Sequence, residues 1–398
     1  MTPQQRGAYR RSAHPTTMGE VTTYAAAYTA DRPFHTALLA ELDSAGSAFR
    51  HITPNWFASV MGTGIVATAA ATLPLHVPGL HEFATAVWIL AGTVLVVLTT
   101  AFATHWIRHR EQAKAYAAHH VVGQFYGAPA MALLTVGAGA LLLGPPIIGP
   151  SAALALDVVL WTAGTVLGLV VALWLPFAMI TREDHTDVEA VPAWMMPVVS
   201  PMVSASTGAL LLSHLGPGQA GMTLLVACYA MFGLSLLAGL ITTTMVYSRL
   251  MHGGFSQLQA IPTVWIVLGV VGQSITAANL LAAHAGSVLT DAATVSALHA
   301  FGIVYGLVMG GFGAFVFCLA AALTVHGARR GLSFSLTWWS FTFPVGTCVT
   351  GASALGAATG AVAISGLAVV LYVLLLGAWA TVATNTVRGV RSGRLLRG

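Results

Sequence analysis

The sequence predicts an all-α integral membrane protein with ten transmembrane helices, arranged as five helical hairpins around a central pore. Three observations lead to this fold class. The 398 residues are 57% hydrophobic and only 7% charged, whereas an ordinary soluble domain is about 25% charged. Long apolar runs recur along the chain, and outside the two tails Lys and Arg occur only between alternate runs. A water-soluble surface cannot be built from this composition.

The chain divides into three parts. Residues 1–50 form an N-terminal tail of mixed polarity, residues 51–387 form the ten-helix transporter or channel domain, and residues 388–398 form a basic tail. The apolar residues of the first part favour either a short interfacial helix or a disordered tail, since four of them share one helical face: Phe34, Leu38, Leu39 and Leu42. We expect no chemistry there.

Ten apolar runs are long enough to cross the hydrocarbon core of a bilayer, which takes about 20 residues of helix. The predicted spans are 52–73, 83–106, 127–148, 153–180, 194–215, 219–249, 260–284, 292–326, 337–358 and 361–386. The 42 glycines suit close packing of such helices, because small residues let their backbones approach.

Basic residues predict the orientation of these spans. Apart from the arginines of the N-terminal tail, they follow the even-numbered spans only: Arg108, Arg110 and Lys114, then Arg182, Arg249, Arg329 and Arg330, and finally Arg388, Arg391, Arg394 and Arg397. The five opposite loops contain neither Lys nor Arg. By the positive-inside rule, both termini are expected in the cytoplasm, and we expect the protein in the plasma membrane.

Prolines predict which helices face the pore. Each odd-numbered span carries one near its start: Pro54, Pro129, Pro201, Pro262 and Pro344. Proline frees a backbone carbonyl, which lipid cannot satisfy but a water-filled lumen can. We therefore expect kinked odd helices inside and even helices outside. The alternative is that these prolines are ordinary kinks packed against neighbouring helices.

Weakly polar residues on the odd helices are the candidate pore lining. They are Gly62, Thr63, Gly64, Thr135, Ser204, Thr207, Ser274 and Thr347. Hydroxyls, freed N–H groups and the positive ends of half-helices can replace part of an anion's hydration shell. Any one hydroxyl can instead bond to its own helix backbone.

Charged groups are almost absent from the spans. Asp157 lies near the start of the fourth span and Asp291 just before the eighth, and this scarcity of charge argues against a pump, which needs charged relays in the membrane. The histidines His76, His81, His214 and His284 lie near the predicted outer side, with His299 early in the eighth span. They can be read as pH sensors or as ordinary loop residues.

Cysteine and histidine spacing predicts no metal site, no cofactor and no enzyme. Cys228, Cys318 and Cys348 all lie in apolar runs and read as small core residues. A histidine-ligated membrane oxidoreductase is the alternative of another class, and it needs two imidazoles that face each other. The placement of the basic residues favours a lipid bilayer as the partner and not nucleic acid.

The ninth span contains WWSFTFPVGT at residues 338–347. A phenylalanine beside a proline break on an inner helix could close a narrow lumen by steric and dewetting effects. The alternative is core packing. Phe343 and Phe341 are therefore the candidate pore gate.

At PNWFASVMGTGIV, residues 54–66, the sequence resembles the tellurite-resistance/dicarboxylate transporter family. Plant slow anion channels, a bacterial tellurite-resistance protein, and yeast malate permeases and sulfite pumps belong to it. FYGAPAMALLTVG, which begins at Phe125, and WWSFTFP look like the third and ninth helices of that family. The resemblance implies a pore of odd helices, a homotrimer and a gating phenylalanine, best matched by Phe343, with Phe341 as the alternative.

The resemblance does not select the transported anion, because members carry chloride, nitrate, malate, sulfite or tellurite-related anions. A lumen without fixed cations favours small monovalent anions, whereas the family favours C4-dicarboxylates such as malate. Both stay open. The predicted function is a gated anion pathway. Its rival is a proton-coupled dicarboxylate or sulfite/tellurite exporter, with His299 or an outer histidine as the proton carrier.

Overall fold

The computed structural model describes residues 49–75, 77–183, 188–255 and 257–397. Over these residues the chain is helical and contains no β-strand, so the all-α membrane fold class is confirmed. Residues 1–48, with the apolar face at 34–42, and His76 lie outside the described residues.

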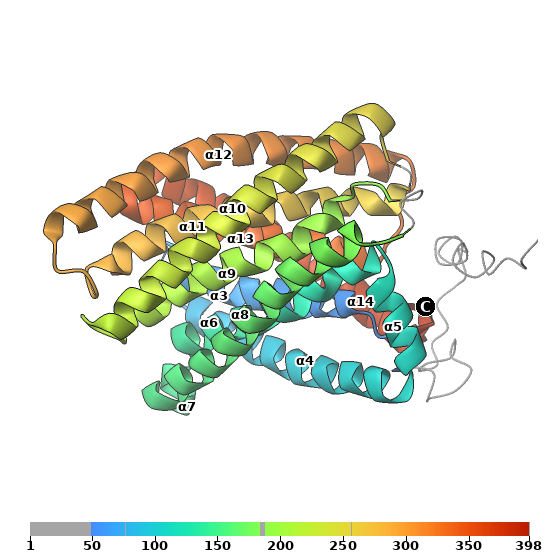
Figure 1. Cartoon of the computed structure of the whole chain (residues 1–398), viewed down its shortest axis with the longest axis horizontal. Coiled ribbons are helices and arrows are strands. Elements are labelled where there is room, and N and C mark those ends of the chain that lie inside the picture. The colour runs from blue at the N-terminus through green and yellow to red at the C-terminus, as the bar shows by residue number, and fades with distance from the viewer. Residues whose placement is uncertain (1–48, 76, 184–187, 256, 398) are drawn as a thin grey trace, which may run out of the picture.

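Five helices form a central ring. They are α3 (Ala58–Thr72), α6 (Gly127–Leu143), α9 (Met195–Leu212), α11 (Val267–Ala285) and α13 (Phe343–Thr359). Each contacts the next one along the chain, and α13 contacts α3. In Figure 1, α3, α9, α11 and α13 lie between α12 and α4, which run along opposite edges of the view. The contacts therefore close a ring.

Five longer helices cover the ring. They are α4 (Leu80–Arg108), α8 (Pro150–Ile180), α10 (Gln219–Gly253), α12 (Ala292–Arg329) and α14 (Val362–Ser392). Each packs both on the ring helix that precedes it and on the following one, and α14 returns to α3. In the most apolar stretch of these helices only 11–33% of residues are buried, against 67–89% for α6, α9, α11 and α13 with their 3-10 starts.

Nine helices within the described ranges are long and apolar enough to cross a membrane. The first predicted span, 52–73, is helical too, because α3 and the 3-10 segment before it run from Pro54 to Thr72, but this segment is not one of the nine. It is buried from Ala58 to Ala70. Ten membrane crossings therefore stay a prediction. The span predicted over 127–148 is interrupted, because α6 ends at Leu143 and prolines begin the short α7 (Pro145–Ile148).

Every ring helix begins with a 3-10 segment. These segments are η2 (Pro54–Phe57), η3 (Val122–Tyr126), η4 (Pro192–Trp194), η5 (Leu258–Ile266) and η6 (Leu336–Phe341). A 3-10 segment is narrower than an α-helix. The entrance to the ring at this end is therefore built from tighter turns than the rest.

The predicted kink prolines occupy different positions in these segments. Pro54 begins η2 and Pro344 is the second residue of α13, where a missing N–H has no cost because the first turn has no acceptor for it. Pro129 is the third residue of α6, Pro262 lies inside η5, and Pro201 lies inside α9. Whether they kink the helices stays a prediction.

Glycines set the close contacts within the ring. A Cβ atom at Gly127 would lie 2.3 Å from the Met196 carbonyl oxygen, and one at Gly272 would lie 2.5 Å from the Thr347 carbonyl carbon. Such close approach needs a residue without a side chain. The α6–α9 and α11–α13 contacts therefore depend on glycine.

Hydrogen bonds tie the outer helices to the ring. The indole of Trp88 in α4 donates to the Val136 carbonyl in α6 at 3.0 Å, and Trp161 in α8 donates to the Ser204 carbonyl in α9 at 2.9 Å. The hydroxyl of Tyr372 in α14 donates to the Val66 carbonyl in α3 at 3.3 Å. Each of these three outer helices thus bonds to the next ring helix around the ring: α4 to α6, α8 to α9 and α14 to α3.

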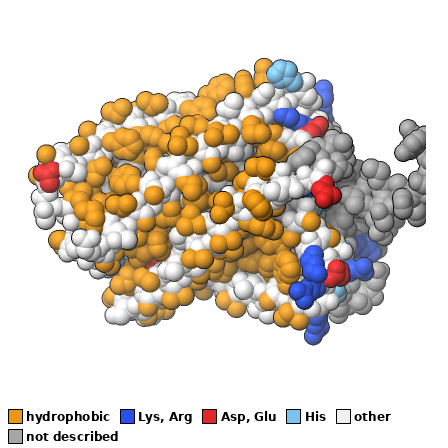
Figure 2. Space-filling model, viewed as in Figure 1, with side chains coloured by type: hydrophobic (Ala, Val, Ile, Leu, Met, Phe, Trp, Pro, Cys, Tyr) orange, Lys and Arg blue, Asp and Glu red, His pale blue; other side chains and the backbone are white. Residues whose placement is uncertain are grey.

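Basic side chains gather at one end of the molecule. Figure 2 shows Lys and Arg near that end of the visible face, and hydrophobic side chains cover most of the remainder. The short helices α5 (Arg110–Ala118) and η7 (Arg394–Leu396) belong to the same end. The Tyr116 hydroxyl of α5 lies 2.7 Å from His51 Nδ1, which joins α5 to the chain just before η2. That this end faces the cytoplasm stays a prediction.

Candidate permeation pathway

A cavity of about 310 Å³ lies inside the ring, in the half remote from the basic residues. All five ring helices line it. The apolar lining is Ile65, Ala138, Leu142, Val203, Leu210, Leu280, Phe343, Ala354 and Ala357; the polar lining is Thr68, Thr72, Thr135, Ser206, Thr207, Gln273, Thr276, Thr350 and Ser353. No charged side chain belongs to this lining.

Helical spacing explains why these residues share the cavity. On α6 the lining positions Thr135, Ala138 and Leu142 are three and four residues apart, and α3 repeats this spacing from Ile65. Positions with this spacing lie on one face of an α-helix. Each ring helix therefore turns one mixed face inward, and the cavity is polar only where that face carries hydroxyl or amide groups.

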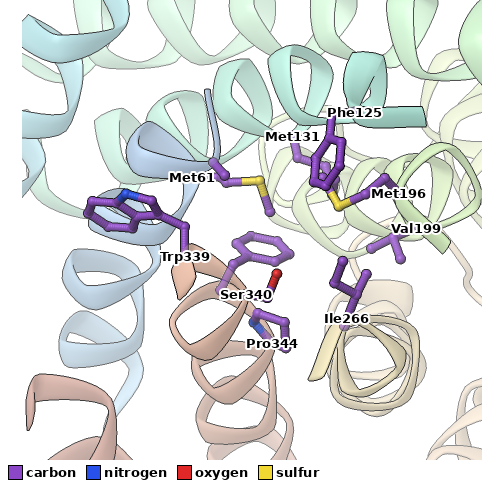
Figure 3. Close-up of a pocket in the computed structure, with 12 residues that line it drawn as sticks. Met61, Phe125, Met131, Met196, Val199, Ile266, Trp339, Ser340 and Pro344 are labelled. Carbon is purple, nitrogen blue, oxygen red and sulfur yellow. The ribbon is translucent and has the colours of Figure 1, made fainter. Parts of the chain in front are cut away.

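A constriction of about 20 Å³ lies on the basic side of the cavity, with room for about one water molecule. Three methionines and several aromatic and aliphatic side chains surround it: Met61, Met131, Met196, Phe125, Val199, Ile266 and Trp339. Figure 3 shows Met61, Met196 and Ile266 converging on this space from different helices. The pathway is thus narrow here, and its lining is apolar apart from Ser340.

Phe343 borders both spaces. Its side chain lines the cavity and the constriction, and only 2% of it is exposed. Phe341 differs, because its ring packs against Trp265 and Trp338, with centroid distances of 5.7 and 5.6 Å, and it lines neither space. Of the two candidate gate residues, only Phe343 therefore lies between the constriction and the cavity.

Only some of the pore-lining candidates predicted from the sequence line the cavity. Thr135 and Thr207 line the cavity, whereas Ser204, Ser274 and Thr347 are fully buried and do not. The Thr347 hydroxyl donates to the Pro344 carbonyl, and its oxygen also lies 3.1 Å from the Leu268 carbonyl oxygen. The hydroxyls of Ser204 and Ser274 donate to carbonyls of their own helices.

The Met-Gly-Thr-Gly motif on α3 is also directed away from the cavity. The Thr63 hydroxyl accepts a hydrogen bond from the Trp379 indole of α14 at 3.1 Å. A Cβ atom at Gly62 would lie 2.2 Å from the Thr342 hydroxyl oxygen, and one at Gly64 would lie 2.8 Å from Thr135 Cγ2. The motif therefore packs α3 against α6, α14 and the turn between η6 and α13.

Sequence reasoning missed several lining residues. Thr68, Thr72, Thr350 and Ser353 line the cavity, although none of them stands in a recognisable motif. Their signal was spacing, since Thr68 and Thr72 lie four residues apart and Thr350 and Ser353 lie three apart. A search for polar pairs with this spacing would have found them.

Titratable groups lie outside the cavity lining. His299 is exposed on α12, His214 is exposed beyond α9, and Asp157 is fully buried between α8 and α6 beside Gly137. Asp291 accepts hydrogen bonds from the Thr294 hydroxyl and from its backbone N–H, and these bonds lower the pKa of that carboxyl. Among the described residues no group of three or more His, Cys, Asp or Glu could hold a metal ion.

Comparison with known proteins places these features in context. Residues 51–387 match the family described as voltage-dependent anion channel. An uncharacterized transporter of Methanocaldococcus jannaschii is 25% identical over 366 residues, which cover 91% of this chain and 100% of that protein. A sulfite efflux pump of Arthroderma otae is 25% identical over 345 residues, or 85% of this chain and 91% of the pump. A sulfite efflux pump of Trichophyton rubrum is 25% identical over 314 residues, or 78% and 83%.

Proposed function

The chain belongs to the voltage-dependent anion channel family, and from this premise we propose that it is a gated pathway for small anions along the axis of the ring. The resemblance to the tellurite-resistance/dicarboxylate transporter family is confirmed by this match and by the sulfite efflux pumps among its relatives. The long apolar helices and the family agree on a multi-pass membrane protein.

The observation that carries the proposal is the position of Phe343. Five helices surround one axis, and along it a 310 Å³ cavity and a 20 Å³ constriction share this single side chain. A solute that follows the axis has to displace the Phe343 ring. We propose that the closed pathway opens when that ring moves.

The constriction excludes ions through the chemistry of its lining as well as through its small size. Met61, Met131 and Ile266 offer no hydrogen bond to an ion that loses its water at the constriction. A narrow apolar segment also expels water and so blocks ions before it is sterically sealed. The phenylalanine therefore acts as a steric and dewetting gate.

The lining of the cavity favours small monovalent anions over dicarboxylates. No Lys, Arg or His lines it, so selection rests on size and on the cost of removing water, which is much larger for a second charge. Two of the relatives are sulfite efflux pumps, so sulfite is a further candidate substrate. Malate stays as the competing substrate. We further expect a homotrimer in the plasma membrane with both termini in the cytoplasm.

The rival reading is a proton-coupled exporter. It needs a titratable group on the pathway, but its best candidate, His299, is exposed on α12, the least buried of the outer helices. A steep dependence of uptake on an imposed pH gradient would favour the rival. The oxidoreductase alternative has no support from the relatives, which are transporters, and a Soret band in the purified protein would revive it.

The test is anion flux into liposomes that hold the purified full chain. Chloride, nitrate, sulfite and malate are compared for the wild type, Phe343→Ala and the matched control Phe341→Ala, with protein-free liposomes for passive leak. We expect Phe343→Ala to raise the flux of small anions and to exclude cations, and Phe341→Ala to resemble the wild type. If no anion enters with any of the three proteins, the proposal fails.

A further inference from the structure

We infer that the basic end of the molecule carries a binding site for the headgroup of an anionic phospholipid, separate from the permeation pathway. The site is an open pocket of about 510 Å³ at the junction of α4 and α5. Three arginines line it: Arg50, Arg108 and Arg110. None of the three lines the cavity or the constriction, so the inference does not depend on anion flux.

The pocket holds more positive than negative charge. Only Glu111 among its lining residues is acidic, and the Glu111 carboxylate already bonds to Lys114 at 3.0 Å. Within the part of the chain that the structure describes, none of the three arginines forms an ion pair. A guanidinium group binds phosphate through two parallel N–H bonds. The charge of the pocket therefore complements a phosphate group.

Two hydrogen bonds hold the backbone of Arg50 over the junction of α4 and α5. The residue before it, Phe49, accepts a bond through its carbonyl oxygen from His105 Nδ1 of α4 at 3.1 Å. The residue after it, His51, bonds through Nδ1 to the Tyr116 hydroxyl of α5 at 2.7 Å. A segment that is anchored on both sides loses little conformational freedom when a ligand binds. Arg50 is therefore positioned beside the other two arginines before any ligand arrives.

The positive charge of this region also acts on a neighbouring imidazole. Burial, followed by the charges of Arg50, His105 and His109, lowers the pKa of His51 from its ordinary value of 6.5. Each of these positive charges disfavours a further proton close by. An anion bound beside Arg50 would relieve the same repulsion.

The position of the pocket favours a lipid over a soluble anion. Helix α4, which is long and apolar enough to cross a membrane, ends at Arg108, and α5 begins at Arg110 beside that end (Figure 1). Ile107 is 80% exposed and lines the same pocket. At the end of a membrane span, an exposed apolar side chain contacts acyl chains, and a neighbouring arginine reaches the headgroups. The pocket thus combines the apolar and the anionic chemistry of one phospholipid.

The experiment measures how tightly the purified full chain retains its first phosphatidylglycerol molecule, by native mass spectrometry in detergent, with phosphatidylcholine as the uncharged reference. We expect the wild type to prefer phosphatidylglycerol. Arg108→Gln/Arg110→Gln should weaken its binding about 25-fold, because each arginine near a membrane surface contributes about fivefold. The matched control Arg329→Gln/Arg330→Gln removes the same charge from the basic end outside the pocket, and its affinity should stay within about twofold of the wild type.

The melting temperature of the same proteins is the second readout. Without lipid, equal melting temperatures of the variants and the wild type would show that the variants are folded. A ligand that binds only the folded chain raises its stability. Phosphatidylglycerol should therefore raise the melting temperature of the wild type and of the Arg329→Gln/Arg330→Gln control, and not that of Arg108→Gln/Arg110→Gln. Inorganic phosphate at the same concentration should raise none of them.

Four results would each overturn the inference. Equal retention of phosphatidylglycerol and phosphatidylcholine by the wild type would mean that no headgroup site exists. Equal losses in the two double variants would make the attraction a property of the whole basic end. Displacement of phosphatidylglycerol by inorganic phosphate would assign the pocket to soluble anions. A preference that appears only in Glu41→Gln/Asp43→Asn would assign the pocket to this acidic segment of the chain, which precedes the described residues.

Discussion

The two halves of the candidate pathway are built from different chemistry. On the basic side, the constriction leaves about 20 Å³ among methionine, phenylalanine and isoleucine side chains. On the other side, the cavity leaves about 310 Å³ and carries nine hydroxyl and amide side chains. The same five helices line both, but their 3-10 starts contribute Phe125, Ile266 and Trp339 to the constriction only, so sequence and local helix type both produce the difference.

This difference separates closure from selection. An apolar constriction resists ions through dewetting and does not distinguish one small anion from another by hydrogen bonding. A polar cavity distinguishes solutes by their donors and acceptors but is too wide to close. Mutations in the two halves should therefore change different observables: total flux at the constriction, and flux ratios in the cavity.

Truncation at matched positions in the two halves gives the largest expected effect. Met131→Ala at the constriction removes a fully buried side chain and should raise anion flux about tenfold, since each tenfold step needs only about 1.4 kcal/mol of barrier. Leu142→Ala, eleven positions later on α6 and in the cavity lining, should leave flux near that of the wild type. Liposome flux measures both, and equal increases would contradict the separation of the two halves.

Glycine-to-alanine substitutions compare how much close packing in the ring helices and in the outer helices contributes to stability. Gly272→Ala places a Cβ atom 2.5 Å from the Thr347 backbone and should lower the stability by about 1–3 kcal/mol through overpacking. In Gly233→Ala, on α10, the Cβ atom meets nothing within 4 Å, and the melting temperature should stay unchanged or rise slightly. Thermal unfolding in detergent compares them, and a similar loss in both variants would show that ring packing is not special.

Acid should loosen the constricted end slightly. The Nδ1 atom of His119 accepts hydrogen bonds from the N–H groups of Val121 and Val122 at 3.2 and 3.3 Å, at the start of the segment that carries Phe125. Burial, together with the charges of His120 and Arg182, lowers the pKa of His119 from its ordinary value of 6.5.

The folded chain therefore favours neutral His119, and the stability that this residue contributes is lost as the pH falls from about 6.5 toward 5. Because the His119 imidazole is partly exposed, we expect the free energy of unfolding to fall by less than about 1 kcal/mol. His119→Asn retains an acceptor and does not titrate, so its melting temperature should decline less than that of the wild type between pH 7.5 and 5. Identical declines would refute a role for this imidazole.

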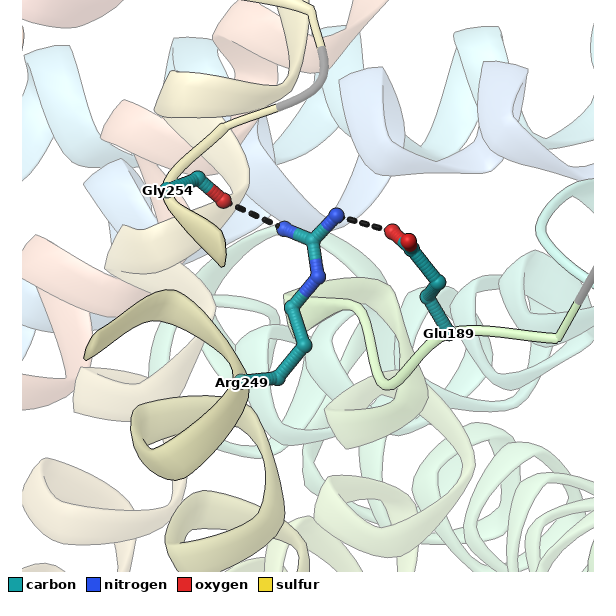
Figure 4. A network of polar contacts seen from close by, with 3 residues as sticks. All are labelled: Glu189, Arg249 and Gly254. Atoms are coloured by element: carbon teal, nitrogen blue, oxygen red, sulfur yellow. Dashed lines mark hydrogen bonds and ion pairs between the residues drawn. The ribbon is translucent and has the colours of Figure 1, made fainter. Parts of the chain in front are cut away.

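The smallest effect is expected from the ion pair at the basic end. Arg249 bonds to the Glu189 carboxylate and donates to the Gly254 carbonyl at 2.6 Å (Figure 4). It links the segments that lead into η4 and η5. Because the Glu189 side chain is 60% exposed, Glu189→Gln should change stability by less than about 0.5 kcal/mol.

Arg249→Met also removes the bond to Gly254 and should cost more than Glu189→Gln. Neither substitution should alter anion flux ratios. Glu111→Gln, which removes the surface ion pair with Lys114, is the control for the loss of a negative charge alone. A change of the ratios in Glu189→Gln would show that this end contributes to selection.

The helices could be predicted from the sequence because hydrophobic runs report the membrane environment directly. The runs at 219–249 and 292–326 become α10 and α12 with ends only a few residues away. The run at 127–148 was too long, because Gly144 and the prolines after it separate α6 from α7.

The site was less accessible to sequence reasoning, because a motif does not state which way its side chains point. Thr63 drew attention through its glycines, yet its partner, Trp379, is 316 residues away. Phe343 and Phe341 are two residues apart, and only packing against Trp265 and Trp338 separates their positions. The direction of each hydroxyl hydrogen depends on backbone geometry, which no spacing rule provides.

The return of α14 to α3 also constrains how this protein is made. The Tyr372 hydroxyl meets the Val66 carbonyl across 306 residues, so the first ring helix is synthesised long before its last neighbour exists. During translation, α3 has only α4 and then α6 beside it, with one flank still uncovered. A ribosome that stops before α13 would leave a ring that cannot close, and one that stops before α14 would leave α3 without part of its outer cover. Membrane quality control could therefore recognise an incomplete chain by the exposed flank of its very first helix.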